Sequence, residues 1–214
     1  NSDQLNALEK ITNFLSSDCE DDVYILKGSA GTGKTSIVKA IVHHLYQEGD
    51  WVRILAPTGR AANVINEKTG VRTQTIHSTI YYPETLDDGR VSLTRKDNSS
   101  DKFTVFIVDE SSMVSNQLHF NSDFHTNRPL LFVLIDYVKQ GNKKNKIIFV
   151  GDRFQLPPVK EEFSPALSLN YLNTHFNLKC KQVELFEVMR QDEASDVLTL
   201  ATQVRDSMLN SYSG

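Results

Sequence analysis

The stretch Gly28-Ser29-Ala30-Gly31-Thr32-Gly33-Lys34-Thr35 matches the phosphate-binding loop pattern G-x-x-x-x-G-K-[ST] at every position. The apolar residues 23–26 precede this loop and predict a buried strand. Apolar residues at the spacing of one helix face follow it, between positions 37 and 45. Strand, glycine loop and helix in this order are the context that the pattern requires. The stretch therefore predicts a nucleotide-binding loop, and a glycine turn that merely joins two elements is the alternative.

Each residue type in the loop has a chemical role. We expect Gly28, Gly31 and Gly33 to take positive φ, which turns backbone N–H groups towards phosphate, and the start of the helix to add the positive end of its dipole. Lys34 can reach the β- and γ-phosphates, and Thr35 can place its hydroxyl on Mg²⁺. The predicted nucleotide-binding residues are Gly28, Ala30, Gly31, Thr32, Gly33, Lys34 and Thr35.

Composition limits the class of protein. With 214 residues, 39% hydrophobic and 23% charged, the chain fits one large domain or one domain with a small insertion. Apolar runs fall short of the ~20 residues that cross a bilayer, and we expect no membrane partner. The start lacks both a secretory leader and an initiator Met, so we expect a mature or trimmed N-terminus. Cys19 and Cys180 form neither a disulfide framework nor a zinc pattern, which favours a reducing cytoplasm.

The net charge of -4 argues against a domain that holds duplex DNA mainly by bulk electrostatics. It leaves room for a local basic groove that binds a single strand.

Apolar strands alternate with amphipathic helices along the chain. We predict strands at residues 23–26, 51–55, 103–108, 147–150 and 182–185, and helices at residues 4–15, 37–45, 60–68, 130–137 and 194–209. This alternation predicts an α/β fold whose parallel sheet is flanked by helices on both faces. Residues 115–128 are polar and receive no element.

Residues 82–102 interrupt the alternation. The turn signal Asp87-Asp88-Gly89 lies between two short apolar runs, which predicts an inserted β-hairpin with a flexible return over residues 95–101. The predicted organisation is therefore a first part at residues 1–81, the hairpin at 82–102 and a second part at 103–214.

Two acids, Asp109 and Glu110, follow the most apolar strand. In a parallel sheet, ligands bind outside the carboxyl ends of the strands, where the phosphate-binding loop also lies. We expect Asp109 to hold Mg²⁺, directly or through water, and Glu110 to take the proton from a water that attacks the γ-phosphate. An acidic pair at an ordinary strand end is the alternative, and the loop upstream favours catalysis.

The stretch 151–159, Gly-Asp-Arg-Phe-Gln-Leu-Pro-Pro-Val, closes the next predicted strand. Gln155, held by Pro157 and Pro158, could orient the attacking water and sense the state of the nucleotide. Alone, this stretch would be read as a Pro-rich turn, and the two other motifs favour the functional interpretation.

Six motifs occur in one order: residues 28–35, 55–62, 75–77, 108–113, 151–159 and 188–191. This order resembles the RecD-like, 5′→3′ branch of superfamily 1 helicases (the Dda and TraA type), and the resemblance covers nearly the whole chain. It implies a RecA-like P-loop NTPase fold, ATP and Mg²⁺ as cofactors, and single-stranded DNA as partner. The chain would be the first ATPase lobe of such a helicase.

The resemblance also implies roles for single residues. Gln4 would read the adenine, Arg190 would touch the γ-phosphate, and the hairpin at 82–102 would split the duplex, although Tyr81 and Tyr82 at its base could stack on bases instead. The residues implied to face single-stranded DNA, away from the nucleotide on the same edge of the sheet, are Pro57, Thr58, Arg60, Thr75 and His77.

Few residues follow Arg190, whereas a second RecA-like lobe needs on the order of 100 or more. We therefore expect an excised first lobe or a truncated gene product whose second lobe is absent. Two other functions stay open. One is a free-standing P-loop phosphotransferase, and the other is a nucleotide-dependent switch module without turnover.

Overall fold

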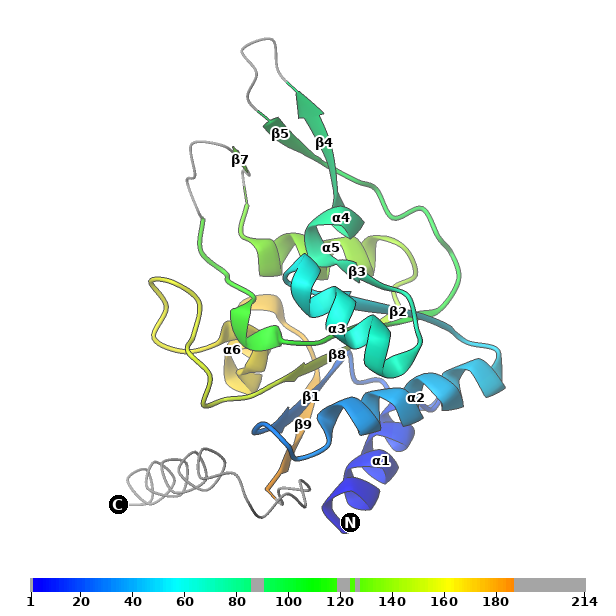
Figure 1. Ribbon diagram of the computed structural model, residues 1–214. Coiled ribbons are helices and arrows are strands. Elements are labelled where there is room, and N and C mark those ends of the chain that lie inside the picture. Colours follow the sequence, from blue (N-terminus) through cyan, green and yellow to red (C-terminus); the bar gives the residue numbers. More distant parts are fainter. Residues whose placement is uncertain (1, 86–90, 119–123, 126–127, 187–214) are drawn as a thin grey trace.

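A six-stranded parallel sheet forms the centre of the protein. The computed structural model describes residues 2–85, 91–118, 124–125 and 128–186 (Figure 1). The strand order is β3-β2-β6-β8-β1-β9, and every pairing is parallel. The strands are β1 (Val23–Gly28), β2 (Trp51–Ala56), β3 (Thr73–Thr75), β6 (Thr104–Val108), β8 (Lys146–Gly151) and β9 (Cys180–Leu185). The predicted parallel sheet is confirmed.

Helices cover both faces of this sheet, as predicted. The helices α1 (Ser2–Leu15), α2 (Lys34–Glu48) and α3 (Gly59–Thr69) pack on one face. The helices α4 (Ile76–Ile80), α5 (Leu130–Gln140) and α6 (Leu169–Phe176) pack on the other (Figure 1). Alternate strand residues point to opposite faces, so Ile107 enters the first core and Phe106 the second. Because both faces are covered, the central strands are apolar over most of their length.

The predicted ends of these elements differ from the observed ones by a few residues, and several short elements were missed. β3 is a three-residue polar strand at the sheet edge, and α4 has only five residues. α6 has eight residues, of which only Leu172 is buried. Such short segments carry too few apolar positions to show a period. The helix predicted at 194–209 lies outside the described residues.

A second, small sheet contains the predicted hairpin. Its strands β4 (Tyr81–Thr85), β5 (Val91–Arg95) and β7 (Phe124–His125) follow the order β4-β5-β7. The hairpin projects away from the main sheet (Figure 1), and its turn at 87–89 lies outside the described residues. β7 comes from the polar stretch 115–128 and pairs parallel to β5. The insertion is therefore tied to a distant part of the chain.

The return from the hairpin is anchored, so the expectation of a flexible return was wrong. The Arg95 guanidinium pairs with Asp136 and donates to Gln140 Oε1 at 2.9 Å, both on α5. Asn98 is 6% exposed, and its Nδ2 donates to the carbonyl oxygen of Tyr137 at 3.1 Å. These contacts bind a polar stretch to the end of α5 although it has no regular structure.

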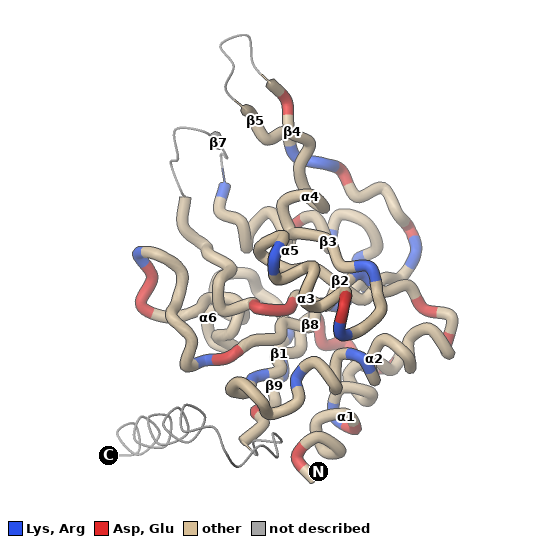
Figure 2. The backbone as a smooth tube through the Cα atoms, viewed as in Figure 1, with Lys and Arg blue, Asp and Glu red and all other residues tan. Residues whose placement is uncertain are grey.

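Charged residues are mixed over the described part of the chain, where Lys and Arg lie among Asp and Glu (Figure 2). Within the same residues, no helix combines the length and apolar character that a bilayer crossing requires.

The candidate active site at the carboxyl edge of the sheet

The parallel sheet brings the predicted motifs to one edge. The carboxyl ends of β1, β2, β6 and β8 lead into the glycine loop, Pro57, Asp109 and Asp152 respectively. β3 pairs with β2 so that Thr75 lies beside Ala56. The sequence-predicted residues of all five motifs in the described part of the chain therefore meet at the same edge. The sixth motif, with Arg190, lies outside the described residues.

The glycine loop has the backbone that phosphate binding requires. Gly31 and Gly33 take φ of 85° and 88°, as predicted. Gly33 is the N-cap of α2 without a side-chain cap bond, so side chains leave the first N–H groups of this helix available. Thr32 is buried and donates its hydroxyl to the Ser29 carbonyl oxygen at 2.9 Å, which braces the loop from within. An anion above the loop would meet backbone N–H groups and the helix dipole together.

Gly28 serves a different purpose from the one predicted. It is absent from the glycines with positive φ, so that prediction was wrong for this position. A Cβ here would lie 2.5 Å from Thr32 Oγ1 and 3.1 Å from Leu185 Cβ. Gly28 is therefore required by the close approach of the loop and β9, and not by backbone conformation.

Lys34 folds back over its own loop. Its Nζ donates to the carbonyl oxygens of Gly28 at 2.5 Å and Ser29 at 3.1 Å. Burial lowers the pKa of Lys34, and the carboxylates of Asp152, Asp109 and Glu110 oppose that effect. Both of these acceptors of the Lys34 ammonium are neutral carbonyls. Negatively charged phosphate oxygens would form stronger hydrogen bonds with it, so Lys34 is suited to exchange the carbonyls for phosphate.

Gln4, at the start of α1, lies against the same loop. Its Nε2 donates to the Thr32 carbonyl oxygen at 3.2 Å. A Cβ at Gly33 would come within 2.0 Å of that nitrogen, so glycine at this position also makes room for Gln4. The structure thus brings Gln4 to the glycine loop.

Asp109 and Glu110 directly follow β6, and Glu110 has a strained backbone conformation. Asp109 is 6% exposed, and its Oδ1 accepts the backbone N–H of Glu110 at 2.8 Å. Burial raises the pKa of Asp109, as does the charge of Glu110, while that hydrogen bond, Lys34 and Lys68 act in the opposite direction. Glu110 has φ of 52°, a backbone conformation that residues other than glycine rarely adopt.

Thr35 and Asp109 line one cavity of about 270 Å³. A hydroxyl and a carboxylate offer the hard oxygen ligands that Mg²⁺ prefers, and Mg²⁺ commonly takes only one or two protein carboxylates together with phosphate oxygens. A cation here would also offset the cost of burying Asp109. The two residues therefore fit the predicted metal.

The same cavity is lined by Glu110 and by Thr58, Arg60 and Lys68 of the α3 segment. Arg60, which was expected away from the nucleotide on the same edge of the sheet, thus shares a cavity with Thr35 and Asp109. Thr58 and Thr75 cap α3 and α4, where they accept the N–H groups of Ala61 at 3.2 Å and Ser78 at 3.1 Å. The two caps set where the segments with Pro57, Arg60 and His77 begin.

At the base of the hairpin, the two tyrosines differ. Tyr81 is 5% exposed and packs in the core, which excludes it as the stacking platform considered above. Tyr82 is 58% exposed, and the Lys96 ammonium lies 4.4 Å from its ring centroid. The exposed His77 ring lies 6.0 Å from that of Tyr81.

Three residues of this edge had received no role from the sequence. Asp152 is buried and follows β8 as Asp109 follows β6, and its charge raises the pKa of Lys34 against the larger effect of burial. Its position directly after an apolar strand could have identified it from the sequence. Lys68 reaches the cavity from the last turn of α3. The Ser112 hydroxyl donates to Gln155 Oε1 at 2.5 Å, and these residues are too far apart in sequence for any local pattern to reveal the contact.

Comparison with known proteins agrees with this geometry. A family model described as AAA domain matches residues 1–211. The uncharacterized protein MJ1519 of Methanocaldococcus jannaschii is 34% identical over 161 residues, which are 71% of this chain and 12% of that protein. The ATP-dependent DNA helicase dda of Enterobacteria phage T4 is 30% identical over 188 residues, which are 86% of this chain and 38% of the helicase. The chain thus spans well under half of either relative.

The crystal structure of Pif1 helicase from Candida albicans shares the fold, with a TM-score of 0.61 at 21% identity over 96% of this chain and 44% of that chain. The chain therefore belongs to the AAA-domain family and shares its fold with part of a Pif1 helicase.

Proposed function

We propose that the chain is the ATP-binding and ATP-hydrolysing first lobe of a 5′→3′ translocase or helicase that acts on single-stranded DNA. The observation that carries this proposal is the shared cavity. Thr35, Asp109 and Glu110, whose chemistry suits Mg²⁺ and water activation, line it together with Thr58 and Arg60, the residues implied to face DNA. A single cavity of this kind gives DNA a short physical route to the catalytic carboxylate.

On the nucleotide side, the glycine loop would bind the phosphates through its N–H groups, and Gln4 would contact the adenine. Lys34 would leave the Gly28 and Ser29 carbonyls for the β- and γ-phosphates. Thr35 and Asp109 would hold Mg²⁺, which when bound neutralises charge on the β- and γ-phosphates. Glu110 would accept the proton of the attacking water, while Gln155 and Arg190 would face the γ-phosphate.

On the DNA side, Pro57, Thr58, Arg60, Thr75 and His77 would form one face of the track. A second RecA-like lobe, normally on the same chain, would supply the opposite face and a further arginine to the γ-phosphate. The greater length of the relatives supports this part of the proposal. An arginine supplied from outside is commonly worth about 10³–10⁵ in rate. Closure of the two lobes on ATP and their opening after hydrolysis would move the strand.

Phosphate release measured with and without single-stranded DNA tests the proposal. Stimulation by the strand is expected, and Lys34→Ala should remove it. Phosphate transfer to a small metabolite would instead identify a phosphotransferase. Tight nucleotide binding without turnover, even in the two-lobe parent, would identify a switch module.

A further inference from the structure

The loops after β6 and β8 meet at one side-chain contact beside the nucleotide edge. Ser112 belongs to the short 3-10 helix η1 (Ser111–Met113), two residues beyond Glu110, and is completely buried. Gln155 belongs to the loop that follows β8. The hydroxyl of Ser112 donates to Gln155 Oε1 at 2.5 Å.

Ser112 is itself held from several sides. Ser164 Oγ donates to the Ser112 carbonyl oxygen at 3.0 Å. Gly151 allows the backbone of η1 to approach β8, since a Cβ there would lie 3.2 Å from the Ser112 nitrogen. Farther along the same two loops, Glu161 Oε1 accepts the Asn116 N–H at 2.8 Å and the Ser115 hydroxyl at 3.1 Å. The Ser112 hydroxyl therefore occupies a fixed position, whereas Gln155 is an exposed side chain on a loop.

A glutamine side chain has an accepting end and a donating end. Because Ser112 donates to the oxygen of Gln155, the NH₂ group is the end that remains for a ligand. The oxygens of a nucleotide γ-phosphate accept hydrogen bonds. A Gln155 amide rotated by half a turn would instead present its oxygen to the phosphate, which is repulsive.

We propose that Ser112 is a positioning residue that fixes the Gln155 amide with its N–H groups towards the γ-phosphate of a bound nucleoside triphosphate. This inference rests on the proposed function, because that function assigns Gln155 to the γ-phosphate. It adds that the site distinguishes a triphosphate from a diphosphate partly through Ser112, a residue that touches neither.

The test is a set of calorimetric titrations of the 214-residue chain with a non-hydrolysable ATP analogue and with ADP. Ser112→Ala should lower the preference for the triphosphate by about 3–10-fold, the worth of one ordinary hydrogen bond, and leave the affinity for ADP unchanged. Gln155→Ala should lower that preference at least as much. In the double variant the preference should equal that of Gln155→Ala alone, because Ser112 acts only through Gln155.

Ser168→Ala is the matched control, since it removes a partly buried hydroxyl that caps α6 by accepting the Tyr171 N–H and that lies outside the contacts described above for Ser112 and Gln155. It should retain the preference. Gln155→Glu leaves Ser112 untouched and keeps an acceptor for it, but presents an anionic oxygen to the phosphate. The Gln155→Glu variant should lose the preference for the triphosphate most strongly. If Ser112→Ala does not fold, this variant still tests whether the end of the Gln155 side chain that faces the phosphate must donate.

An unchanged preference in Ser112→Ala, or additive losses in the double variant, would overturn the inference and leave nucleotide binding intact. An unmodified chain that binds both nucleotides equally would also overturn it. An unmodified chain that binds neither nucleotide would overturn the proposed function itself.

Discussion

The two edges of the sheet each contain a largely buried lysine, and these lysines are used differently. At the amino edge, Lys146 Nζ donates to the carbonyl oxygens of Phe14 and Cys19 at 2.7 Å each and of Asp21 at 3.3 Å. Its acceptors belong to the end of α1 and to the segment that enters β1, far away in the sequence. At the carboxyl edge, Lys34 donates to carbonyls of the loop directly before it. Lys146 therefore joins distant elements, whereas Lys34 can change partners without disturbing the fold.

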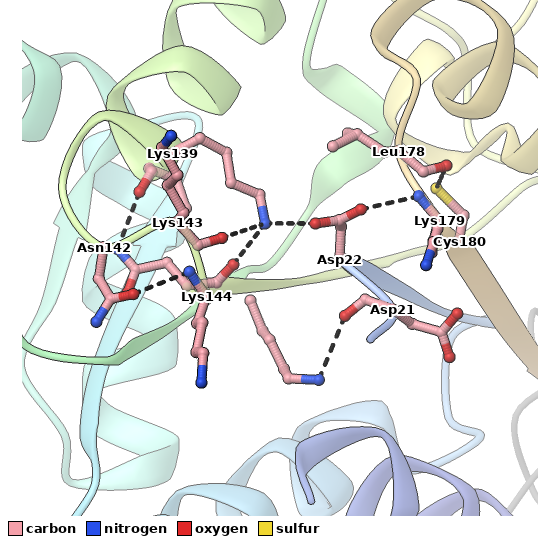
Figure 3. A network of polar contacts seen from close by, with 12 residues as sticks. Asp21, Asp22, Lys139, Asn142, Lys143, Lys144, Leu178, Lys179 and Cys180 are labelled. Carbon is pink, nitrogen blue, oxygen red and sulfur yellow. Dashed lines mark hydrogen bonds and ion pairs between the residues drawn. The ribbon is translucent and has the colours of Figure 1, made fainter. Parts of the chain in front are cut away.

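The carboxylates show the same contrast. At the amino edge, Asp22 accepts Lys139 Nζ at 2.6 Å and the Lys179 N–H at 2.9 Å (Figure 3). The chain itself compensates this charge. At the carboxyl edge, burial raises the pKa of Asp109 in spite of Lys34 and Lys68 nearby. The comparison indicates that the charge of Asp22 at the amino edge is compensated within the chain. At the carboxyl edge, Asp109 and Lys34 are instead placed to bind a metal cation and a phosphate anion.

The largest effect that follows concerns Glu110. If this chain acts with a second lobe as proposed, Glu110→Gln in that two-lobe protein should lower steady-state turnover by about 10²–10⁴-fold, because the amide keeps the shape but cannot accept the proton of water. Binding of ATP should be retained. Glu67→Gln, an exposed change on α3, is the control. Turnover of Glu110→Gln within a few-fold of the unmodified enzyme would show that another group is the base.

Lys34→Ala should weaken binding of ATP with Mg²⁺ by on the order of 10²-fold, since charge-assisted hydrogen bonds to phosphate are lost. The melting temperature should change little, because only the Gly28 and Ser29 carbonyls lose a partner. Calorimetry and thermal unfolding of the same preparation measure both quantities. Retained affinity would contradict the assignment of the loop.

The converse is expected at the other edge. Lys146→Ala should lower the free energy of unfolding by about 2–4 kcal/mol, because buried carbonyl oxygens lose their donor and a cavity replaces the stem. Below the melting transition, the affinity for ATP should stay near that of the unmodified chain. Urea unfolding measures the first quantity and calorimetry the second. A variant with normal stability and impaired affinity would remove the distinction between the two lysines.

The sequence predicted the parts of the site that are local in the chain. The glycine loop, Asp109 and Glu110 each follow a strongly apolar strand, so one short pattern supplies both the residue and its place at the edge. Gly28 could not be interpreted correctly, because its constraint comes from Thr32 and Leu185 and not from its own φ.

Features that depend on distant contacts were missed for the same reason. Asn98 looks like a loop residue until the carbonyl of Tyr137 is placed beside it. The contact of Ser112 with Gln155 requires the register of β6 and β8, which no local period encodes. β3 was missed because a polar edge strand lacks the apolar run that identified its neighbours.

The smallest expected effect concerns Arg60, whose exposed guanidinium lies at the carboxyl edge in the cavity of Glu110. If Arg60 contacts one phosphate of the strand, Arg60→Ala should flatten the dependence of log K on log salt by about 0.7, the value for one contact to a single strand. Affinity at low salt should fall by about 3–10-fold for strands of any sequence, because a phosphate contact carries no base information. Lys144→Ala is the matched control, since it removes the same charge from an exposed position at the amino edge (Figure 3). Equal slopes for the two variants would mean that Arg60 acts only through net charge. If Arg60→Ala flattens the salt dependence more than Lys144→Ala does, Arg60 contacts the DNA strand directly. The DNA would then bind at the same edge of the sheet as the nucleotide, which would allow the coupling between DNA and ATP that a motor requires.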